Sequence, residues 1–143
     1  MQKTVGHILA FKGQDVWSIP SDISVLDALS MLAEKNIGAL VVVNDGVLIG
    51  IVSERDYARK VILADKSSRD TLVSDIMTPD PVTVTSTDTV GACMGLMTEN
   101  RFRHLPVVDD GVLKGVISIG DVVRAVIEEQ EFLIEQLEGY ITG

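Results

Sequence analysis

The feature that most constrains this chain is an internal duplication. Shifting the sequence by 65 positions places residues 40–56, LVVVNDGVLIGIVSERD, on residues 105–121, LPVVDDGVLKGVISIGD, and ten of the 17 aligned pairs are identical without a gap. Upstream, residues 25–35 and 90–100 share a helical spacing of apolar side chains. Further back, TVGHIL at 4–9 resembles LVSDIM at 72–77 with an offset of 68. The chain is therefore expected to fold as two similar units.

Both halves predict the same order of elements, β-α-β-β-α, behind a short leading helix. The two central strands are joined by NDG or DDG, which is typical of a two-residue β-hairpin. The polar segment ADKSSRDT predicts a linker between the halves. The expected ranges are 5–10 and 73–77 for the leading helices, 16–19 and 82–84 for the first strands, 25–35 and 90–100 for the next helices, and 57–63 and 122–129 for the closing helices.

The last stretch, EEQEFLIEQLEGYITG, belongs to neither repeat. Leu133, Leu137, Tyr140 and Ile141 are spaced i, i+4, i+7 and i+8, which indicates an amphipathic helix. Two interpretations remain open. The helix either folds back over its own core or packs on another subunit.

Size and composition predict a globular fold of two halves that pack on each other. The chain has 143 residues, and a unit of about 60 residues is marginally stable alone. Hydrophobic residues make up 46% and aromatic residues 4%, so the core is expected to consist of Val, Ile, Leu and Met. A net charge of −9 argues against non-specific binding of nucleic acid.

The single cysteine and the lack of long apolar runs bear on location. Cys93 has no partner for an internal disulfide, which suits a reducing compartment. The longest apolar run is far too short to cross a bilayer, and the N-terminus lacks the pattern of a signal peptide. We therefore expect a cytoplasmic protein with no membrane partner.

Both repeats end their second hairpin strand with the pattern Gly-x-x-Ser-x-x-Asp, at 50–56 and 115–121. In one interpretation Ser53 and Ser118 are helix N-caps, and Asp56 and Asp121 take the N3 position of a capping box. In the other, the helix start and serine receive a phosphate, and the aspartate accepts hydrogen bonds from two ribose hydroxyls. The same geometry serves both interpretations, so the pattern alone leaves them open.

In its repeated form the sequence resembles paired cystathionine β-synthase (CBS) domains, a nucleotide-sensing tandem module. The resemblance covers Val5 to about Glu129 and rests on IGALVVVNDG…GIVSERD, FRHLPVVDDG…GVISIGD and VSDIMTPDPVTV. The format, with an extra C-terminal helix, looks like small bacterial and archaeal CBS-pair proteins. The resemblance implies an α/β (α+β) fold of two repeats, 8–66 and 74–130, packed sheet to sheet with pseudo-twofold symmetry, plus a helical extension at 131–143.

The resemblance also implies two clefts that bind adenosine ligands: AMP, ADP, ATP, NAD or S-adenosylmethionine. In each cleft the signature aspartate of one repeat holds the ribose, and strands of the other repeat receive the adenine. No metal is expected. Carried onto this sequence, one cleft contains Ser53, Arg55 and Asp56 with Thr83, Val84, Arg103, His104, Leu105 and Pro106, and the other contains Ser118, Gly120 and Asp121 with Ser18, Ile19, Gly38, Ala39 and Leu40.

The two predicted clefts are unequal. Residues 36–39 read NIGA, whereas the aligned residues 101–104 read RFRH. The basic group would lie opposite Asp56, next to Arg55, and such donors suit several phosphates or a pyrophosphate. We therefore expect the Asp56 cleft to bind anions more tightly, and the Asp121 cleft to bind a different ligand, bind weakly or stay empty.

Other side chains with chemical potential have plainer interpretations. His104 is expected to contact a phosphate or the backbone, His7 to lie on the surface, and Cys93 to be a buried small hydrophobe rather than a nucleophile. Trp17 either stacks on an adenine or packs at the rim or core. Arg55, Arg59 and Lys60 form either a solvated face or a second phosphate contact.

No motif of a catalytic site is present. The sequence contains no Gly-x-x-x-x-Gly-Lys-Ser/Thr, His-Glu-x-x-His or Cys-x-x-Cys, and phosphoryl transfer needs such a phosphate loop with metal-holding carboxylates. We therefore expect a non-catalytic sensor, read by a homodimer surface or an unknown effector protein. A nucleotide-processing enzyme and an assembly protein with vestigial clefts are the alternatives.

Overall fold

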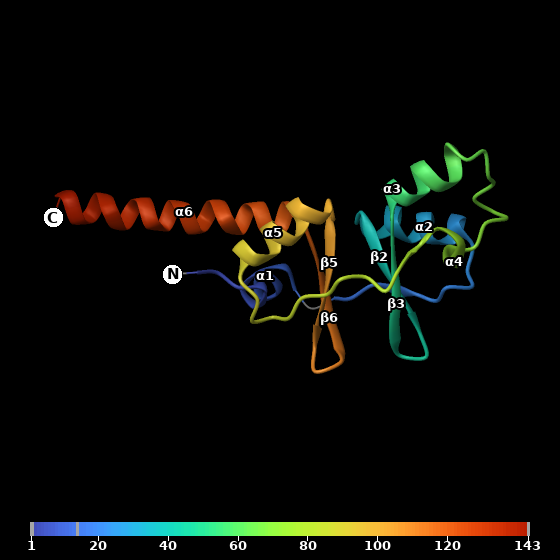
Figure 1. Cartoon of the computed structure of the whole chain (residues 1–143), viewed down its shortest axis with the longest axis horizontal. Coiled ribbons are helices and arrows are strands. Elements are labelled where there is room, and N and C mark those ends of the chain that lie inside the picture. Colours follow the sequence, from blue (N-terminus) through green and yellow to red (C-terminus); the bar gives the residue numbers. More distant parts are fainter. Residues whose placement is uncertain (1, 14, 143) are drawn as a thin grey trace. The chain divides into compact units, whose positions relative to one another are not determined.

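The computed structural model describes residues 2–13 and 15–142 (Figure 1). It divides into two compact units, Trp17–Pro81 and a second one made of Met1–Val16 with Val82–Gly143. We call these the first unit and the second unit. Each contains the hairpin and signature of one repeat, so the expected duplication is confirmed.

The first unit is a four-stranded sheet with helices. Strand order is β1-β2-β3-β4, with β1 parallel to β2 and the other pairs antiparallel. The structure contains strand β4, which the sequence analysis did not predict. The elements are β1 (Ser18–Ile19), α2 (Val25–Lys35), β2 (Ala39–Asn44), β3 (Val47–Ser53), α3 (Glu54–Tyr57), the π-helical turn η1 (Ala58–Ile62), α4 (Val73–Ile76) and β4 (Thr78–Pro79).

The second unit repeats this plan around one hairpin. Its elements are α1 (Val5–Lys12), α5 (Val90–Asn100), β5 (His104–Asp109), β6 (Val112–Ser118) and α6 (Ile119–Thr142). The expected strand at 82–84 is reduced to a single parallel bridge between Val84 and Val107. Main-chain bonds still hold it, since Val84 N–H donates to Pro106 O at 3.0 Å and Val108 N–H donates to Val84 O at 2.9 Å.

The two hairpins have the turn that their sequence predicts. Asp45 and Gly46 have φ angles of 50° and 79°, and Asp110 and Gly111 have 50° and 78°. Two consecutive positive φ angles define a type I′ turn, which twists to match the flanking strands. The register is also shared, because Ala39 pairs with Ser53 and His104 pairs with Ser118.

Each leading helix belongs to the unit that contains the hairpin of the other repeat, which the sequence repeats do not show. Helix α1 lies in the second unit and α4 in the first. A side chain from each leading helix or its C-cap packs on the signature glycine of that unit: a Cβ added to Gly50 would lie 2.5 Å from Met77 Sδ, and one added to Gly115 would lie 2.8 Å from Leu9 Cδ2. The glycine of the signature is therefore required by the close approach of the leading helix.

Each unit has its own core, built from the aliphatic residues that composition predicts. The first contains Val25, Leu40 and Ile76, and the second contains Leu105 and Ile117 among others, all with at most 1% of their surface exposed. Four of the five lie in the hairpins and leading helices, and Val25 is the first residue of α2. The cores thus fix the two signatures at the ends of β3 and β6.

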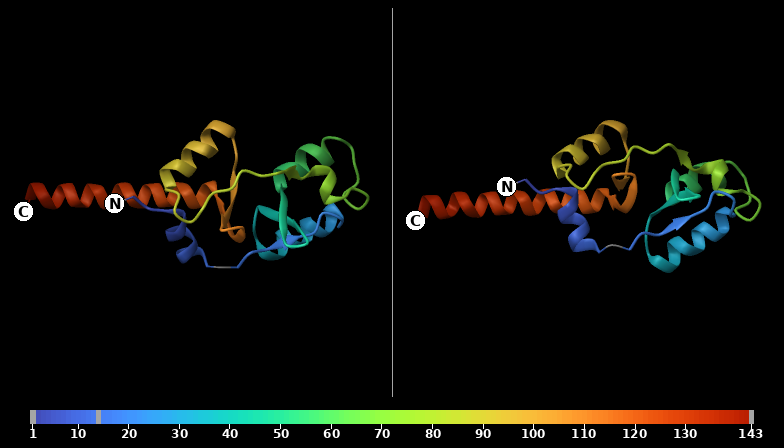
Figure 2. Two further views of the ribbon diagram at one scale, coloured as in Figure 1. Left: turned by 60° about the horizontal axis from the view of Figure 1, so that its bottom comes forward. Right: turned by 90° about the horizontal axis from the view of Figure 1, so that it is seen from below.

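Helix α6 continues without a break from the closing helix into the C-terminal stretch (Figures 1 and 2). Its last turns project beyond the rest of the second unit, and Leu133, Leu137 and Tyr140 are 56%, 56% and 90% exposed. The stretch does not fold back over its own core, so that interpretation is wrong. Packing on another subunit stays a prediction.

Candidate functional site

The two signatures form matching helix starts. Asp56 N–H donates to Ser53 Oγ at 3.2 Å, and Ser53 N–H donates to Asp56 Oδ2 at 2.9 Å. Asp121 N–H donates to Ser118 Oγ at 3.2 Å, and Ser118 N–H donates to Asp121 Oδ2 at 2.8 Å. The capping interpretation is confirmed in both repeats. The carboxylates nevertheless remain partly accessible, with 16% and 21% of their side chains exposed.

A lysine contacts each signature carboxylate, and the two lysines come from non-equivalent positions. Lys60, one helical turn after Asp56, places Nζ 3.2 Å from Asp56 Oδ1 and 2.8 Å from the carbonyl oxygen of Ile76. Lys12, at the end of α1, places Nζ 2.7 Å from Asp121 Oδ2 and 2.9 Å from the carbonyl oxygen of Val116. In the sequence repeat Lys60 aligns with Ala125, and Lys12 aligns with Asp80.

The pKa of Asp121 lies below its ordinary value. Burial of the carboxyl alone would raise this pKa, but the hydrogen bonds from Lys12 and from Ser118 N–H, with the charge of Lys12, more than offset the burial. Asp121 is therefore ionised at neutral pH and acts only as a hydrogen-bond acceptor. An ionised carboxylate can accept hydrogen bonds from two hydroxyls at once.

The structure brings several predicted site residues together within each unit. The carbonyl of Gly38 accepts a hydrogen bond from Glu54 N–H at 3.1 Å, beside Ser53, and that of Arg103 accepts from Ile119 N–H at 2.8 Å, beside Ser118. The start of the first hairpin strand thus lies against the signature of the same repeat. The predicted grouping of residues from different repeats stays a prediction.

Burial decides whether each predicted site residue can offer a ligand its side chain or only its main-chain groups. Leu40 and Leu105 are fully buried in the cores, so they can present only main-chain groups. The exposed members can offer side chains. The buried members are Ile19, Ala39, Leu40, Val84, Leu105 and Pro106; the exposed ones are Ser18, Arg55, Thr83, Arg103 and Gly120; the remainder, Gly38, Ser53, Asp56, His104, Ser118 and Asp121, are intermediate.

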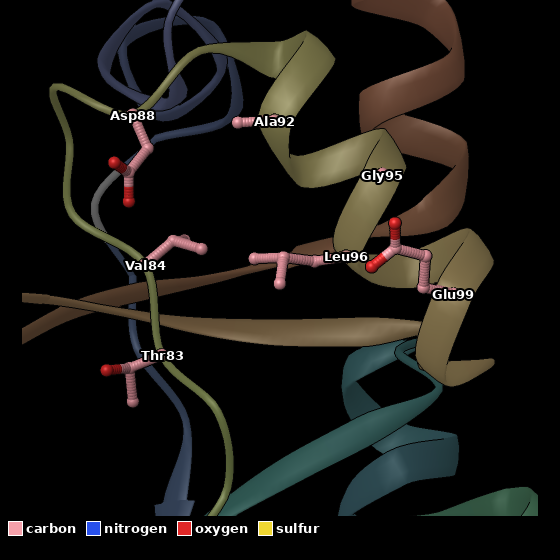
Figure 3. Close-up of a pocket in the computed structure, with 7 residues that line it drawn as sticks. All are labelled: Thr83, Val84, Asp88, Ala92, Gly95, Leu96 and Glu99. Atoms are coloured by element: carbon pink, nitrogen blue, oxygen red, sulfur yellow. The ribbon is translucent and has the colours of Figure 1, made fainter.

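A hollow of about 400 Å³ adjoins two of the predicted residues, Thr83 and Val84, in the second unit. Figure 3 shows Val84 and Leu96 pointing toward each other across it, with the carboxylate-bearing Asp88 and Glu99 at its margins. On the α5 side the wall is formed by the small residues Ala92 and Gly95. Apolar side chains with a few polar groups are the usual lining of a small-molecule site.

The aligned positions of the first repeat are bulkier. Ala92 and Gly95 align with Asp27 and Ser30, and Asp88 aligns with Ile23. Ile23 packs against the core of the first unit. The wall residues of the hollow thus differ between the two repeats, as do residues 36–39 and 101–104.

The plainer interpretations are confirmed for Cys93 and His7. Cys93 is buried, and burial together with the nearby charge of Asp88 raises the pKa of its thiol to about 11, which makes it a poor nucleophile. His7 is exposed and accepts a hydrogen bond from Thr4 N–H at 3.0 Å. Trp17 is at the rim, 38% exposed, with Lys35 Nζ 4.1 Å from its ring centre.

Sequence reasoning missed the role of Lys12 and the α5 wall of the hollow. The i, i+4 spacing of Asp56 and Lys60 is a usable signal for their ion pair. Lys12 is 109 residues from Asp121, so no local pattern links them. Within residues 2–13 and 15–142, no group of three or more His, Cys, Asp and Glu side chains is arranged to hold a metal ion.

The family model described as "CBS domain" matches this chain twice, at residues 8–63 and 73–128. The chain belongs to the CBS-domain family. Both matches begin and end within three residues of the expected repeats, and each contains one hairpin and one Gly-x-x-Ser-x-x-Asp signature. A tandem CBS pair with an additional C-terminal helix is therefore the architecture of this protein.

Similar proteins support the same assignment. The mitochondrial CBS domain-containing protein CBSX3 of Arabidopsis thaliana is 43% identical over 98% of this chain and 72% of its own length. A putative signal-transduction protein with CBS domains from Burkholderia ambifaria MC40-6 superposes with a TM-score of 0.85 at 47% identity, covering 90% of this chain and 96% of that one.

Two solved CBS structures contain adenosine compounds. CBSX2 in complex with AMP has a TM-score of 0.71 at 32% identity, covering 88% of this chain and 97% of that one. The CBS pair of protein MJ0100, in complex with 5-methylthioadenosine and S-adenosyl-L-methionine, has a TM-score of 0.78 at 25% identity, covering 90% and 99%.

Some relatives are longer than this chain, which spans 64% of CBSX2 and 22% of CBSCBSPB3 from the same plant. None of the helices in the described part of the chain has the length and apolar character needed to cross a bilayer.

Proposed function

We propose that this chain is a non-catalytic regulatory module that binds an adenosine-containing ligand through its two signature aspartates. The observation that carries the proposal is the duplicated helix start, in which a serine caps the helix and a partly exposed aspartate is oriented by the main chain of that serine. A carboxylate held in this way accepts hydrogen bonds from the two hydroxyls of a ribose. Two such groups in one chain make two ligand sites.

The proposed ligands are AMP, ADP, ATP or NAD. The ribose is common to all of them, and the AMP complex of CBSX2 and the adenosine ligands of MJ0100 support this class of ligand. Each site is proposed to use the signature of one repeat together with the first strands of the other, as in the residue groups given above. Energy sensing is the role that this choice of ligands would serve.

The two sites are proposed to differ in affinity for phosphate. Arg103 and His104 accompany Asp56 in one group, whereas Gly38 and Ala39 accompany Asp121 in the other. Arginine donors bind phosphate oxygens in bidentate geometry, so the Asp56 site is proposed to be the tighter one for nucleotides with several phosphates.

Titration of AMP, ATP, NAD, NADH and S-adenosylmethionine tests the proposal. A ligand at 100 times its dissociation constant should stabilise the chain by about 2.7 kcal/mol, which a thermal-shift assay detects as several degrees. Asp56→Asn and Asp121→Asn should each weaken one site, because an amide keeps an acceptor for the cap but loses the charge. Arg103→Ala should weaken ATP binding more than Asp121→Asn does, and equal losses would contradict the ranking of the sites.

The same experiment separates the alternatives. Ligand recovered chemically unchanged after long incubation supports a sensor, whereas turnover would show a nucleotide-processing enzyme. Absence of any thermal shift across the panel would favour an assembly protein with vestigial sites.

Signalling is proposed to act through a ligand-dependent arrangement of the repeats. A ligand changes such an arrangement only if it binds one state more tightly than the other. The readers are proposed to be a homodimer, with the exposed apolar side chains of α6 at the subunit contact, and an effector protein in the cytoplasm. Sedimentation with and without AMP measures the dimer part of this proposal.

A further inference from the structure

The carboxylate of Asp121 is already engaged in the second unit. Its Oδ2 accepts hydrogen bonds from Ser118 N–H at 2.8 Å and from Lys12 Nζ at 2.7 Å. A carboxylate oxygen has two lone-pair positions, so Oδ2 is fully used. A vicinal diol that bridges a carboxylate gives one hydroxyl to each oxygen. Such a diol therefore needs a position on Oδ2 that Lys12 or the main chain now occupies.

Of these two donors only Lys12 can leave. The Ser118 N–H is main chain and is part of the capping box that starts α6, whereas Lys12 Nζ ends a flexible side chain that is 41% exposed. Helix α1 itself is held by Val5 and Ile8, which are 0% and 7% exposed, and by the contact of Leu9 with Gly115. The side chain of Lys12 can thus swing away while α1 stays docked.

We propose that Lys12 is a specificity-determining residue that occupies the ribose acceptor of Asp121 and must be displaced by an incoming ligand. This inference rests on the proposed function. A ligand that brings only a diol displaces the Lys12 ammonium from Asp121 and supplies no anion to pair with that ammonium. A ligand that also carries a phosphate offers the released ammonium an anion. Lys12 therefore favours nucleotides over neutral nucleosides at this site.

In the other repeat, a lysine contacts the signature aspartate without occupying the acceptor position that a ribose would need. Lys60 contacts Asp56 on Oδ1 at 3.2 Å, and Oδ2 is contacted by Ser53 N–H and by Ser53 Oγ at 2.9 and 3.1 Å. The Ser53 hydroxyl can rotate its hydrogen toward another acceptor, which frees one lone pair of Asp56 Oδ2 for a ligand. A diol at Asp56 therefore has an acceptor on each oxygen while Lys60 stays in place.

Adenosine and AMP are the appropriate probes, since they share the diol and the base and differ in the phosphate. Lys12→Met keeps the apolar stem and removes the charge. Lys3→Met is the control for the loss of a nearby charge alone, because Lys3 lines the same hollow as Lys12 and Asp121 but its Nζ pairs with Glu128 at 2.6 Å. All variants are made in the Asp56→Asn background, so that calorimetry reports the Asp121 site.

We expect Lys12→Met to bind adenosine roughly 1.5- to fivefold more tightly, the range for loss of one partly exposed ion pair. Its preference for AMP over adenosine should fall, because the ammonium that pairs with the phosphate is gone, whereas Lys3→Met keeps the ion pair of Lys12 with Asp121 and should not tighten adenosine binding. Adenosine binding that Lys12→Met leaves unchanged or weakens would overturn the inference.

The outcomes also separate this inference from the proposed function. If AMP binds in a manner that Asp121→Asn abolishes, but Lys12→Met does not tighten adenosine, only the role of Lys12 is refuted. If neither probe binds to any variant or to the unmodified chain, the proposed function is refuted and the inference is refuted with it. Adenosine binding that is detectable only in Lys12→Met would support both.

Discussion

The two signatures of this chain have the same serine cap and the same aspartate, yet they differ in the helix that follows and in the source of the lysine that pairs with the aspartate. After Asp56 the helix widens into the π turn Ala58–Ile62, which carries Lys60, whereas after Asp121 it continues as α6. The cation on Asp121 comes instead from α1. Both solutions pair the carboxylate with a lysine that also binds a main-chain carbonyl. Duplication has thus kept the local geometry of the helix start while the source of charge has diverged.

The test of this comparison with the largest expected effect concerns the two signature glycines. A Cβ at Gly50 would meet Met77 Sδ at 2.5 Å and the main-chain oxygen of Thr78 at 3.1 Å, whereas at Gly115 it would meet the end of Leu9 alone. Because main chain cannot move aside as a side chain can, Gly50→Ala should lower the free energy of unfolding by about 1–3 kcal/mol. Gly115→Ala should cost less. Urea denaturation of both variants measures the difference.

Gly95→Ala is the control for this pair. No atom lies within 4 Å of its added Cβ, and alanine is favoured over glycine within a helix, so this variant should gain roughly 0.5–1 kcal/mol. Equal losses in Gly50→Ala and Gly115→Ala would show that the leading helices approach the two glycines in the same way.

Much of this fold was predictable because its signals are local. Apolar spacing gave α2 and α5 over their full ranges, and the Asp-Gly pairs gave both type I′ turns. The exchange of α1 and α4 between the units was not predictable. It depends on the fit of Leu9 and Met77 to glycines more than 25 residues away in sequence.

The site, like the fold, was predictable only where its signals are local in the sequence. The capping of Ser53 and Ser118 follows from residue type and spacing alone. The ion pair of Lys12 with Asp121 joins residues at opposite ends of the chain, and the hollow beside Thr83 depends on how far α5 stands from the segment 82–84. Such features follow from tertiary packing, which a pattern along the chain does not contain.

A second test compares the two cores at one aligned position. The first unit has Ala28 where the second has Cys93, and both are buried. Cys93→Ala removes one heavy atom from a packed core and should cost about 1 kcal/mol. The substitution should also remove a loss of stability that the unmodified chain shows at alkaline pH. The thiol has its pKa raised to about 11 in the fold, so its contribution to stability is complete below its ordinary pKa near 9 and is lost as the pH rises toward 11.

Thiol labelling provides the measurement and its control. In the unmodified chain, a thiol reagent should react with Cys93 only when the second unit opens, so labelling rates report that unit alone. Ligands that stabilise the second unit should slow the labelling. Rapid labelling of the native chain at neutral pH would contradict the burial of Cys93.

The smallest expected effect concerns the charge on Asp121. The pKa of this carboxyl is lowered in the fold because Lys12 and Ser118 outweigh its burial. As the pH falls, the unfolded chain therefore takes up the proton first, so the contribution of Asp121 is complete above its ordinary pKa near 4 and is lost as the pH falls through the lower folded value. Asp121→Asn should remove up to about 1 kcal/mol from the decline in stability between pH 6 and pH 3.

Asp109 and Glu128 also have lowered pKa values, owing to hydrogen bonds from Ser86 and Lys3, so only the difference between variant and unmodified chain isolates Asp121. Lys12→Met should flatten the same decline in part, because the bond from Ser118 N–H remains, and an unchanged slope in both variants would show that the ion pair adds nothing to stability.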